Sequence, residues 1–122
     1  MTELTTSAPK TLIISNNMVE ADDLTEILTG QGLGPVVHVR GVADAHDALT
    51  QSGEHLRLML FGLSMHRHDV ADFPTKYDAS TCPLILIDGP SELSDRAGAG
   101  VLLRPYSTDD VLAALARLGF GT

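Results

Sequence analysis

Five short apolar segments constrain the fold of this chain more than any other feature of its sequence. Four are strong and the last is weaker; in order they are "TLIIS" (11–15), "PVVHV" (35–39), "LRLMLF" (56–61), "PLILI" (83–87) and "GVLL" (100–103). Most are apolar at consecutive positions instead of alternating ones, which is typical of strands covered on both faces, as in a parallel sheet. The sequence therefore predicts five strands inside the molecule.

Segments with helical spacing lie between these strands. In residues 18–29, apolar side chains recur every three or four positions, and Asn16 or Asn17 is suited to cap the amino end of this helix. Weaker helices are expected at 42–51, 67–80 and 90–98. The second of these contains Pro74, which removes a backbone donor and predicts a short or broken helix.

The last helix is the clearest one in the sequence. Ser107 is a good N-cap, Asp110 can complete a capping box with it, and Gly119 ends the apolar stripe that follows. The order of strand and helix, repeated five times, predicts an α/β fold in three layers. Such a fold has a parallel sheet with right-handed crossovers and helices on both of its faces.

Composition narrows the classes of partner and compartment. A chain of 122 residues with 43% hydrophobic residues predicts one globular domain, at 11–120, after a flexible leader at 1–10. The 16 acidic residues outnumber the 8 Lys and Arg, and the net charge of −8 argues against nucleic acid and anionic membranes as partners. No signal-peptide pattern or membrane-length apolar run is present, and the one cysteine, Cys82, is expected to be a buried thiol. These features favour the cytoplasm.

The segments taken in order resemble the receiver domain of bacterial response regulators over residues 11–120. "TLIISNN" is similar to the first strand and acidic pair of that family, and "LRLMLFGLSMH" to the third strand and phosphoacceptor loop. "CPLILIDG" is similar to the fourth strand, and "GVLLRPY" to the fifth strand with its Lys-Pro-aromatic end. The resemblance implies a doubly wound, flavodoxin-like sheet in the order 2-1-3-4-5 and a role in two-component or phosphorelay signal transduction.

The residues at that family's functional positions differ in this chain. By resemblance, the metal-binding acids fall on Asn16 and Asn17, the phosphoacceptor on Gly62, the switch hydroxyl on Asp88 and the essential lysine on Arg104. Glycine has no oxygen to phosphorylate, and neutral amides lack the charge with which carboxylates hold Mg²⁺. We therefore expect a degenerate pseudo-receiver without catalytic residues, with weak or absent Mg²⁺ binding and no other cofactor.

Asp88 and Arg104 carry opposite charges at positions that flank the phosphate in receivers. One hypothesis is that they pair across the empty pocket and hold the switch in one state. The simpler alternative gives Asp88 an ordinary turn at the strand end, and makes Asn16 and Asn17 helix caps only. The resemblance also implies a cis peptide bond before Pro105.

The expected function is binding to another protein, independent of phosphorylation and without enzyme activity, by a stand-alone domain. A histidine kinase, a phosphotransfer protein, another receiver or a second copy of the chain would be the partner. By resemblance, the interaction face comprises 92–97, 101–106 and 109–117. The switch and interaction residues within it are Val101, Leu102, Pro105 and Tyr106.

Two other functions stay open at this point. A small ligand could occupy the vacated pocket around Asn16, Gly62, Asp88 and Arg104, or Asp69 could serve as a non-standard phosphoacceptor. "HRHD" (66–69) lacks the third ligand that a zinc site requires, so no metal site is expected. "GQGLG" (30–34) follows a helix instead of a strand, and it predicts helix termination and not a phosphate loop.

Overall fold

The computed structural model describes residues 10–41, 43–44, 56–62, 83–88 and 98–120. Its helices and strands are β1 (Lys10–Ile14), α1 (Met18–Gly30), β2 (Val36–Val39), β3 (Leu56–Phe61), β4 (Leu84–Ile87), β5 (Ala99–Leu102) and α4 (Thr108–Arg117). All five expected strands are confirmed to within one residue at each end. The helix expected at 67–80, and nearly all of those expected at 42–51 and 90–98, lie outside the described residues.

The amino-terminal boundary needs a correction of one residue. Lys10 was assigned to the flexible leader, but it begins β1 and pairs there with Leu56 of β3. Its backbone takes part in the sheet because the neighbouring strand extends far enough to reach it. The remainder of the expected leader, 1–9, lies outside the described residues.

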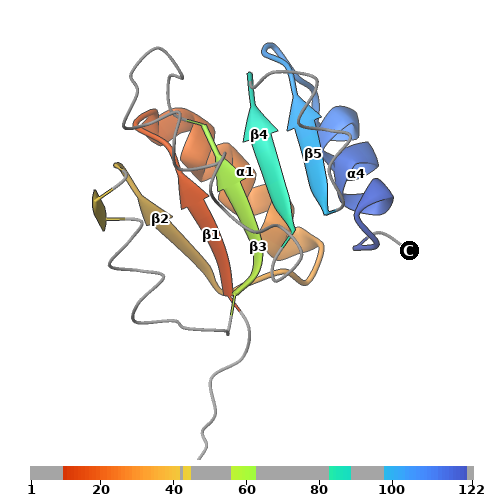
Figure 1. Ribbon diagram of the computed structural model, residues 1–122, viewed down its shortest axis with the longest axis horizontal. Coiled ribbons are helices and arrows are strands. Elements are labelled where there is room, and N and C mark those ends of the chain that lie inside the picture. Colours follow the sequence, from red (N-terminus) through yellow and green to blue (C-terminus); the bar gives the residue numbers. More distant parts are fainter. Residues whose placement is uncertain (1–9, 42, 45–55, 63–82, 89–97, 121–122) are drawn as a thin grey trace, which may run out of the picture.

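The strands form one parallel sheet in the order β2-β1-β3-β4-β5, as expected (Figure 1). The register aligns the ends of neighbouring strands. Ile14 at the end of β1 pairs with Val39 and Phe61, and Ile87 at the end of β4 pairs with Leu102. The residues that follow β1, β3, β4 and β5 therefore meet along a single edge of the sheet, which is where parallel α/β sheets bind ligands.

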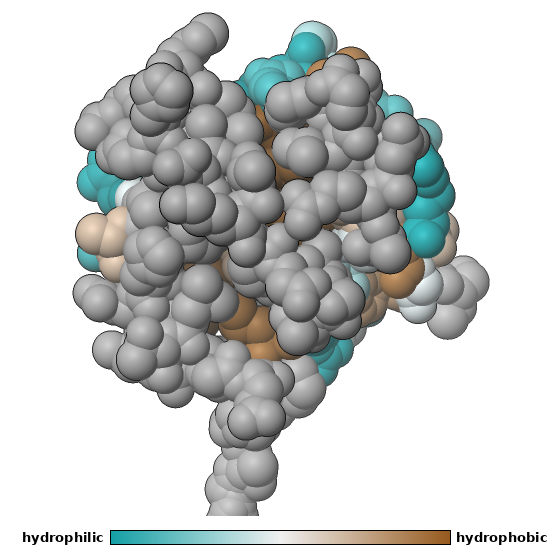
Figure 2. Space-filling view, viewed as in Figure 1, coloured by the Kyte–Doolittle hydropathy of each residue, from teal (hydrophilic) through white to brown (hydrophobic). Residues whose placement is uncertain are grey.

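Both faces of the sheet are buried, which explains the continuous apolar runs. One cluster joins α1 and α4 to the same face of the sheet (Figure 1): Ile13, Ala21, Leu24, Leu28, Leu58, Leu60, Ile85, Ile87, Leu102, Val111 and Leu115. Alternate strand residues that point to the other face are at most 1% exposed: Leu12, Ile14, Met59, Phe61 and Leu86. Figure 2 shows hydrophobic surface toward the middle of the view and hydrophilic surface around its rim.

Both described helices begin at the caps that the sequence indicated. Asn17 caps α1 by accepting a hydrogen bond from the backbone N–H of Glu20 at 3.1 Å. Ser107 and Asp110 form the expected capping box of α4, with distances of 3.1 and 2.9 Å between side-chain oxygens and backbone nitrogens. Within the described residues, neither helix is long and apolar enough to cross a membrane.

Candidate functional site

The residues that directly follow β3 and β4 are held in place by backbone hydrogen bonds. The N–H of Gly62 donates to the carbonyl of Ile14 at 2.7 Å, and the N–H of Asp88 donates to the carbonyl of Leu102 at 2.7 Å. Asp88 has a φ of 60°, in the left-handed region that aspartate tolerates better than most residues. These bonds extend the sheet by one residue beyond β3 and β4 and fix the floor of the site.

The guanidinium of Arg104 connects three segments at this edge. Its Nε and Nη2 donate to the two carboxylate oxygens of Glu20 at 2.8 and 2.7 Å, which is a forked ion pair. Its Nη1 donates to Asp88 at 2.9 Å, and its Nη2 also donates to the carbonyl of Gly62 at 3.1 Å. The backbone N–H of Arg104 donates to Asp88 at 2.8 Å. The hypothesised ion pair between Asp88 and Arg104 is therefore present.

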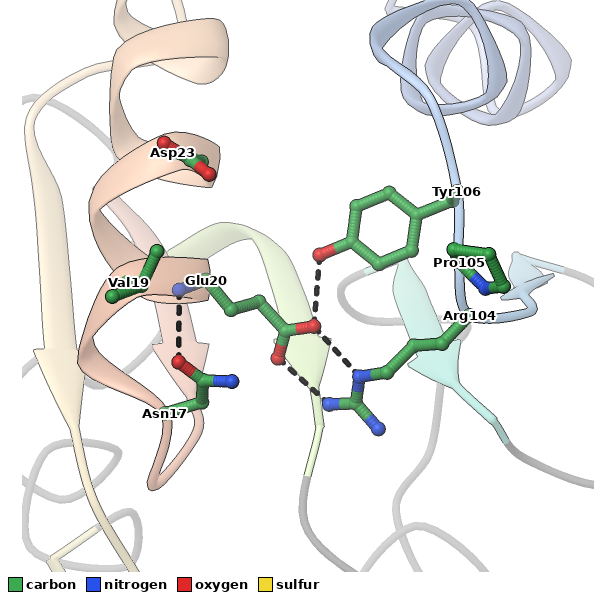
Figure 3. A pocket seen from close by; sticks show the side chains of 7 residues that line it. All are labelled: Asn17, Val19, Glu20, Asp23, Arg104, Pro105 and Tyr106. Carbon is green, nitrogen blue, oxygen red and sulfur yellow. Dashed lines mark hydrogen bonds and ion pairs between the residues drawn. The ribbon is translucent and has the colours of Figure 1, made fainter.

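Glu20, together with Ser15, was not singled out as a site residue by the sequence. The Glu20 carboxylate accepts two hydrogen bonds from Arg104 and one from the hydroxyl of Tyr106 at 3.0 Å (Figure 3). It also accepts one from the hydroxyl of Ser15 at 3.1 Å. Its side chain is only 8% exposed. We call Ser15, Glu20, Asp88, Arg104 and Tyr106 the Arg104 cluster.

The turn between β1 and α1 aims Glu20 at the site. The hydroxyl of Ser15 accepts a hydrogen bond from the N–H of Asn17 at 3.1 Å, and Asn17 in turn caps the helix. Glu20 is the third residue of α1, a position from which a glutamate commonly bonds back to its own N-cap. Here the carboxylate instead crosses to Arg104, 84 residues away in the sequence.

The pocket that the sequence predicted to be vacant is filled, and this is a correction. A Cβ atom at Gly62 would lie 3.3 Å from Arg104 Nη2, 3.3 Å from Glu20 Oε1 and 3.3 Å from Ile87 Cδ1. The missing side chain at Gly62 leaves space that the ion pair of Glu20 and Arg104 occupies. Gly62 thus contributes room and a carbonyl acceptor to the Arg104 cluster.

The two asparagines at the positions of the family's acids have different places. Asn17 is the N-cap of α1, which agrees with the simpler of the two interpretations. Asn16 is exposed, and its side chain makes no hydrogen bond within the described part of the chain. No group of three or more His, Cys, Asp or Glu side chains that could hold a metal is present among the described residues. "HRHD" and Asp69 lie outside them.

Hydrogen bonding sets the charge state of the Arg104 cluster. Burial raises the pKa of Glu20, but hydrogen bonds from Arg104 and Tyr106 outweigh burial and hold that pKa below its ordinary value. The backbone hydrogen bond from Arg104 lowers the pKa of Asp88. The hydrogen bonds to Glu20 raise the pKa of Arg104. The pKa of Tyr106 is raised mainly by burial, and further by the hydrogen bond to the Glu20 carboxylate. At neutral pH the cluster therefore holds two carboxylates, one cation and a neutral phenol.

The four expected switch and interaction residues differ in exposure. Leu102 is 4% exposed and belongs to the core, so it cannot contribute to an interaction face, because its side chain points under α4. Val101 is half-buried. Pro105 is exposed and follows a cis peptide bond, as the resemblance implied. Tyr106 is half-buried, and its hydroxyl points inward to Glu20.

A surface groove of about 510 Å³ lies beside the Arg104 cluster, between α1 and the loop that precedes α4 (Figure 3). It is lined by Asn17, Val19, Glu20, Asp23, Arg104, Pro105 and Tyr106. Val19 is 71% exposed, so the groove has an apolar wall as well as an acidic one. Of the residues expected around a ligand pocket, only Arg104 lines this groove.

No family model matches the chain, and no curated protein matches it. Solved structures do. SdrG from Sphingomonas melonis Fr1 has a TM-score of 0.66 and 24% identity, over 91% of this chain and 96% of that one. A response regulator receiver domain from Bermanella marisrubri has a TM-score of 0.70 and 17% identity, over 92% of this chain and 98% of that one. A response regulator receiver protein from Sinorhizobium medicae WSM419 has a TM-score of 0.68 and 18% identity, over 91% of this chain and 94% of that one. The chain therefore has the flavodoxin-like fold of receiver domains.

Proposed function

We propose that this chain is a receiver-like signalling protein that works by binding another protein and not by accepting a phosphoryl group. The observation that carries the proposal is the ion pair between Glu20 and Arg104, which occupies the space above Gly62. The fold supports a signalling role by likeness to solved receiver domains. We expect the chain to act through its surface, in the cytoplasm, with no enzyme activity of its own.

Phosphoryl transfer in this fold needs a carboxylate nucleophile, a metal ion and room for the phosphoryl group. Gly62 offers no side-chain oxygen, and Glu20 is engaged by four hydrogen bonds. The second carboxylate of the cluster, Asp88, would repel an incoming phosphate. The cation that could attract phosphate, Arg104, is already paired with both carboxylates. These features support phosphorylation-independent action with weak or absent Mg²⁺ binding.

The partners that fit this proposal are a histidine kinase, a phosphotransfer protein, another receiver or a second copy of the chain. Exposed residues on the described part of the expected face include Leu103 and Pro105 before α4, and Asp109 and Arg117 on it. An exposed apolar residue flanked by charges is typical of a surface for protein recognition. The remainder of that face, 92–97, lies outside the described residues.

Incubation with acetyl phosphate and Mg²⁺, followed by intact-mass measurement, tests the proposal. We expect no gain of mass in the natural chain, while a phosphorylatable receiver in the same tube gains one phosphoryl group. Gly62→Asp is the informative variant, because it restores a carboxylate without removing Glu20 or Arg104, although the new side chain must push against both, since its Cβ would lie 3.3 Å from each. We expect it to stay unmodified as well. One phosphoryl group on the natural chain, mapped to Asp69 or elsewhere, would overturn the proposal.

A second candidate function, sensing of a small ligand, is favoured by the groove beside the cluster. Its lining combines the exposed apolar side chain of Val19 with the carboxylate of Asp23, which suits a neutral or cationic compound better than an anion. Thermal-shift screening would reveal such a ligand as a saturable rise in melting temperature. The rise should be lost in Val19→Asp, which removes the apolar wall, and the absence of any rise would remove this candidate.

A further inference from the structure

Four donors from two segments of the chain converge on the carboxylate of Glu20. They are the Nε and Nη2 of Arg104, the hydroxyl of Tyr106 and the hydroxyl of Ser15, at 2.8, 2.7, 3.0 and 3.1 Å. A forked guanidinium matches the two oxygens of a carboxylate, and the two hydroxyls supply further donors to the same group. Figure 3 shows the Arg104 and Tyr106 side chains reaching Glu20 from the loop between β5 and α4.

The donors are positioned by contacts that do not involve Glu20. Arg104 is held by Asp88 through two hydrogen bonds and by the carbonyl of Gly62. The hydroxyl of Ser15 accepts from the N–H of Asn17, and the backbone N–H of Ser15 donates to β2. Tyr106 packs against the hydrophobic core. Because these anchors are independent of the carboxylate, the donor set would keep its geometry if Glu20 were removed.

We propose that Ser15, Arg104 and Tyr106 form a carboxylate-binding site for which Glu20 is the tethered ligand. The chain thereby supplies its own anion, which holds the loop between β5 and α4 against α1 without an external group. When the tether is removed, the site takes a free monocarboxylate from solution. The tether would keep the loop between β5 and α4 permanently in one state, and this regulatory role rests on the phosphorylation-independent function proposed above.

The geometry selects a small planar monoanion over a phosphate. The forked pair matches the two oxygens of one carboxylate, each at 2.7 to 2.8 Å from a guanidinium nitrogen. The space above Gly62 is tight, since a Cβ atom placed on Gly62 would lie only 3.3 Å from Glu20 Oε1. Asp88 lies on the other side of Arg104 at 2.9 Å and would repel a dianion more strongly than a monoanion.

The test uses acetate and the variant Glu20→Ala, which opens the site. Melting temperatures are measured at neutral pH with increasing sodium acetate, and sodium chloride keeps the ionic strength constant. The variant should melt below the natural chain, because Arg104 and Tyr106 lose their shared acceptor. Acetate should then raise its melting temperature along a saturating curve, as a ligand of the folded state does.

Two matched controls separate binding from a general salt effect. Glu20→Gln fills the same space without the charge, and we expect acetate to leave its melting temperature unchanged. The double variant Glu20→Ala/Arg104→Met removes the fork, and we expect it to lose the response. An equal rise in all variants and the natural chain, or no rise in Glu20→Ala, would overturn the proposal.

The outcome stays readable if Glu20→Ala is unfolded without acetate. The same titration, followed by circular dichroism, should then show refolding, and a failure to refold while Glu20→Gln is folded would overturn the proposal. The result is separate from the phosphorylation test. A phosphorylated natural chain would contradict the proposed function while acetate rescue could still succeed, and failed rescue would leave the intact-mass result unaffected.

Discussion

Arg104 lies between two carboxylates that differ sharply in their surroundings. On the α1 side, Glu20 is 8% exposed and accepts four hydrogen bonds. On the β4 side, Asp88 is 44% exposed and, among the described residues, accepts hydrogen bonds from Arg104 only. A buried ion pair is costly to break because one charge stays unpaired out of water, whereas an exposed pair is screened. The N···O distances of the two ion pairs are similar, 2.7 and 2.9 Å, so we expect burial to set the difference in their contributions to stability.

The largest effect is expected when Arg104 is removed and Glu20 is left without its partner. Arg104→Met keeps much of the side-chain volume but removes the fork. We expect the free energy of unfolding to fall by about 3 kcal/mol, the low end for a broken buried pair because Arg104 is itself partly exposed. Urea denaturation measures the change. A loss below that of Asp88→Asn would show that Glu20 is not the more strongly coupled carboxylate.

A smaller effect is expected at the hydroxyl of Tyr106, on the same side of the cluster. Tyr106→Phe removes one donor to Glu20 but keeps the ring against the core. We expect a loss of about 1.5 kcal/mol in the free energy of unfolding, because a hydrogen bond to a charged acceptor is lost. In the Glu20→Gln background, Tyr106→Phe should reduce the free energy of unfolding by less. Equal losses in the natural chain and in Glu20→Gln would argue that the hydroxyl does not stabilise the charge of Glu20.

Acidification should remove part of the stability that the charge of Glu20 gives to the fold. Because the folded pKa of Glu20 lies below its ordinary value of 4.5, its charge stabilises the fold fully above that value. That stabilisation is lost as the pH falls from 4.5 through the folded pKa. The stability difference between the natural chain and Glu20→Gln, measured by urea denaturation across pH, should shrink on acidification. A difference that grows would contradict the assignment.

The smallest effect is expected on the exposed side. Asp88→Asn keeps the oxygen that accepts from the N–H of Arg104, and asparagine also tolerates the left-handed backbone conformation found there. It removes only the charge of a pair that solvent already screens. We expect a change below about 1 kcal/mol, reduced further by added salt. A salt-insensitive loss as large as that of Arg104→Met would make the two carboxylates equivalent.

The sequence predicted the elements of this fold because their causes are local. Uninterrupted apolar runs such as residues 84–87 are typical of strands covered on both faces. The caps at Asn17 and Ser107 depend on residues three positions away, so helix starts were also visible in the sequence. The pairing of Asp88 with Arg104 followed from the resemblance, which placed both positions at one pocket.

Glu20 could not be singled out in the same way. Along α1 it is one of several acidic residues, and its neighbours Asp22 and Asp23 have the same local character. Its place near the start of the helix after β1 was a signal, because that turn lies at the edge where the strands end. Its partner, however, is 84 residues away, and no local pattern connects the two.

The sequence by itself determined which of the described segments become strands and helices, and it showed that position 62 has no nucleophile. It could not decide what fills the space that Gly62 leaves, because the answer depends on the distance between α1 and the end of β5. The tertiary structure brings those segments together around one guanidinium. Burial then assigns the dominant role to Glu20 over Asp88, since only folding removes one carboxylate from water and leaves the other in it.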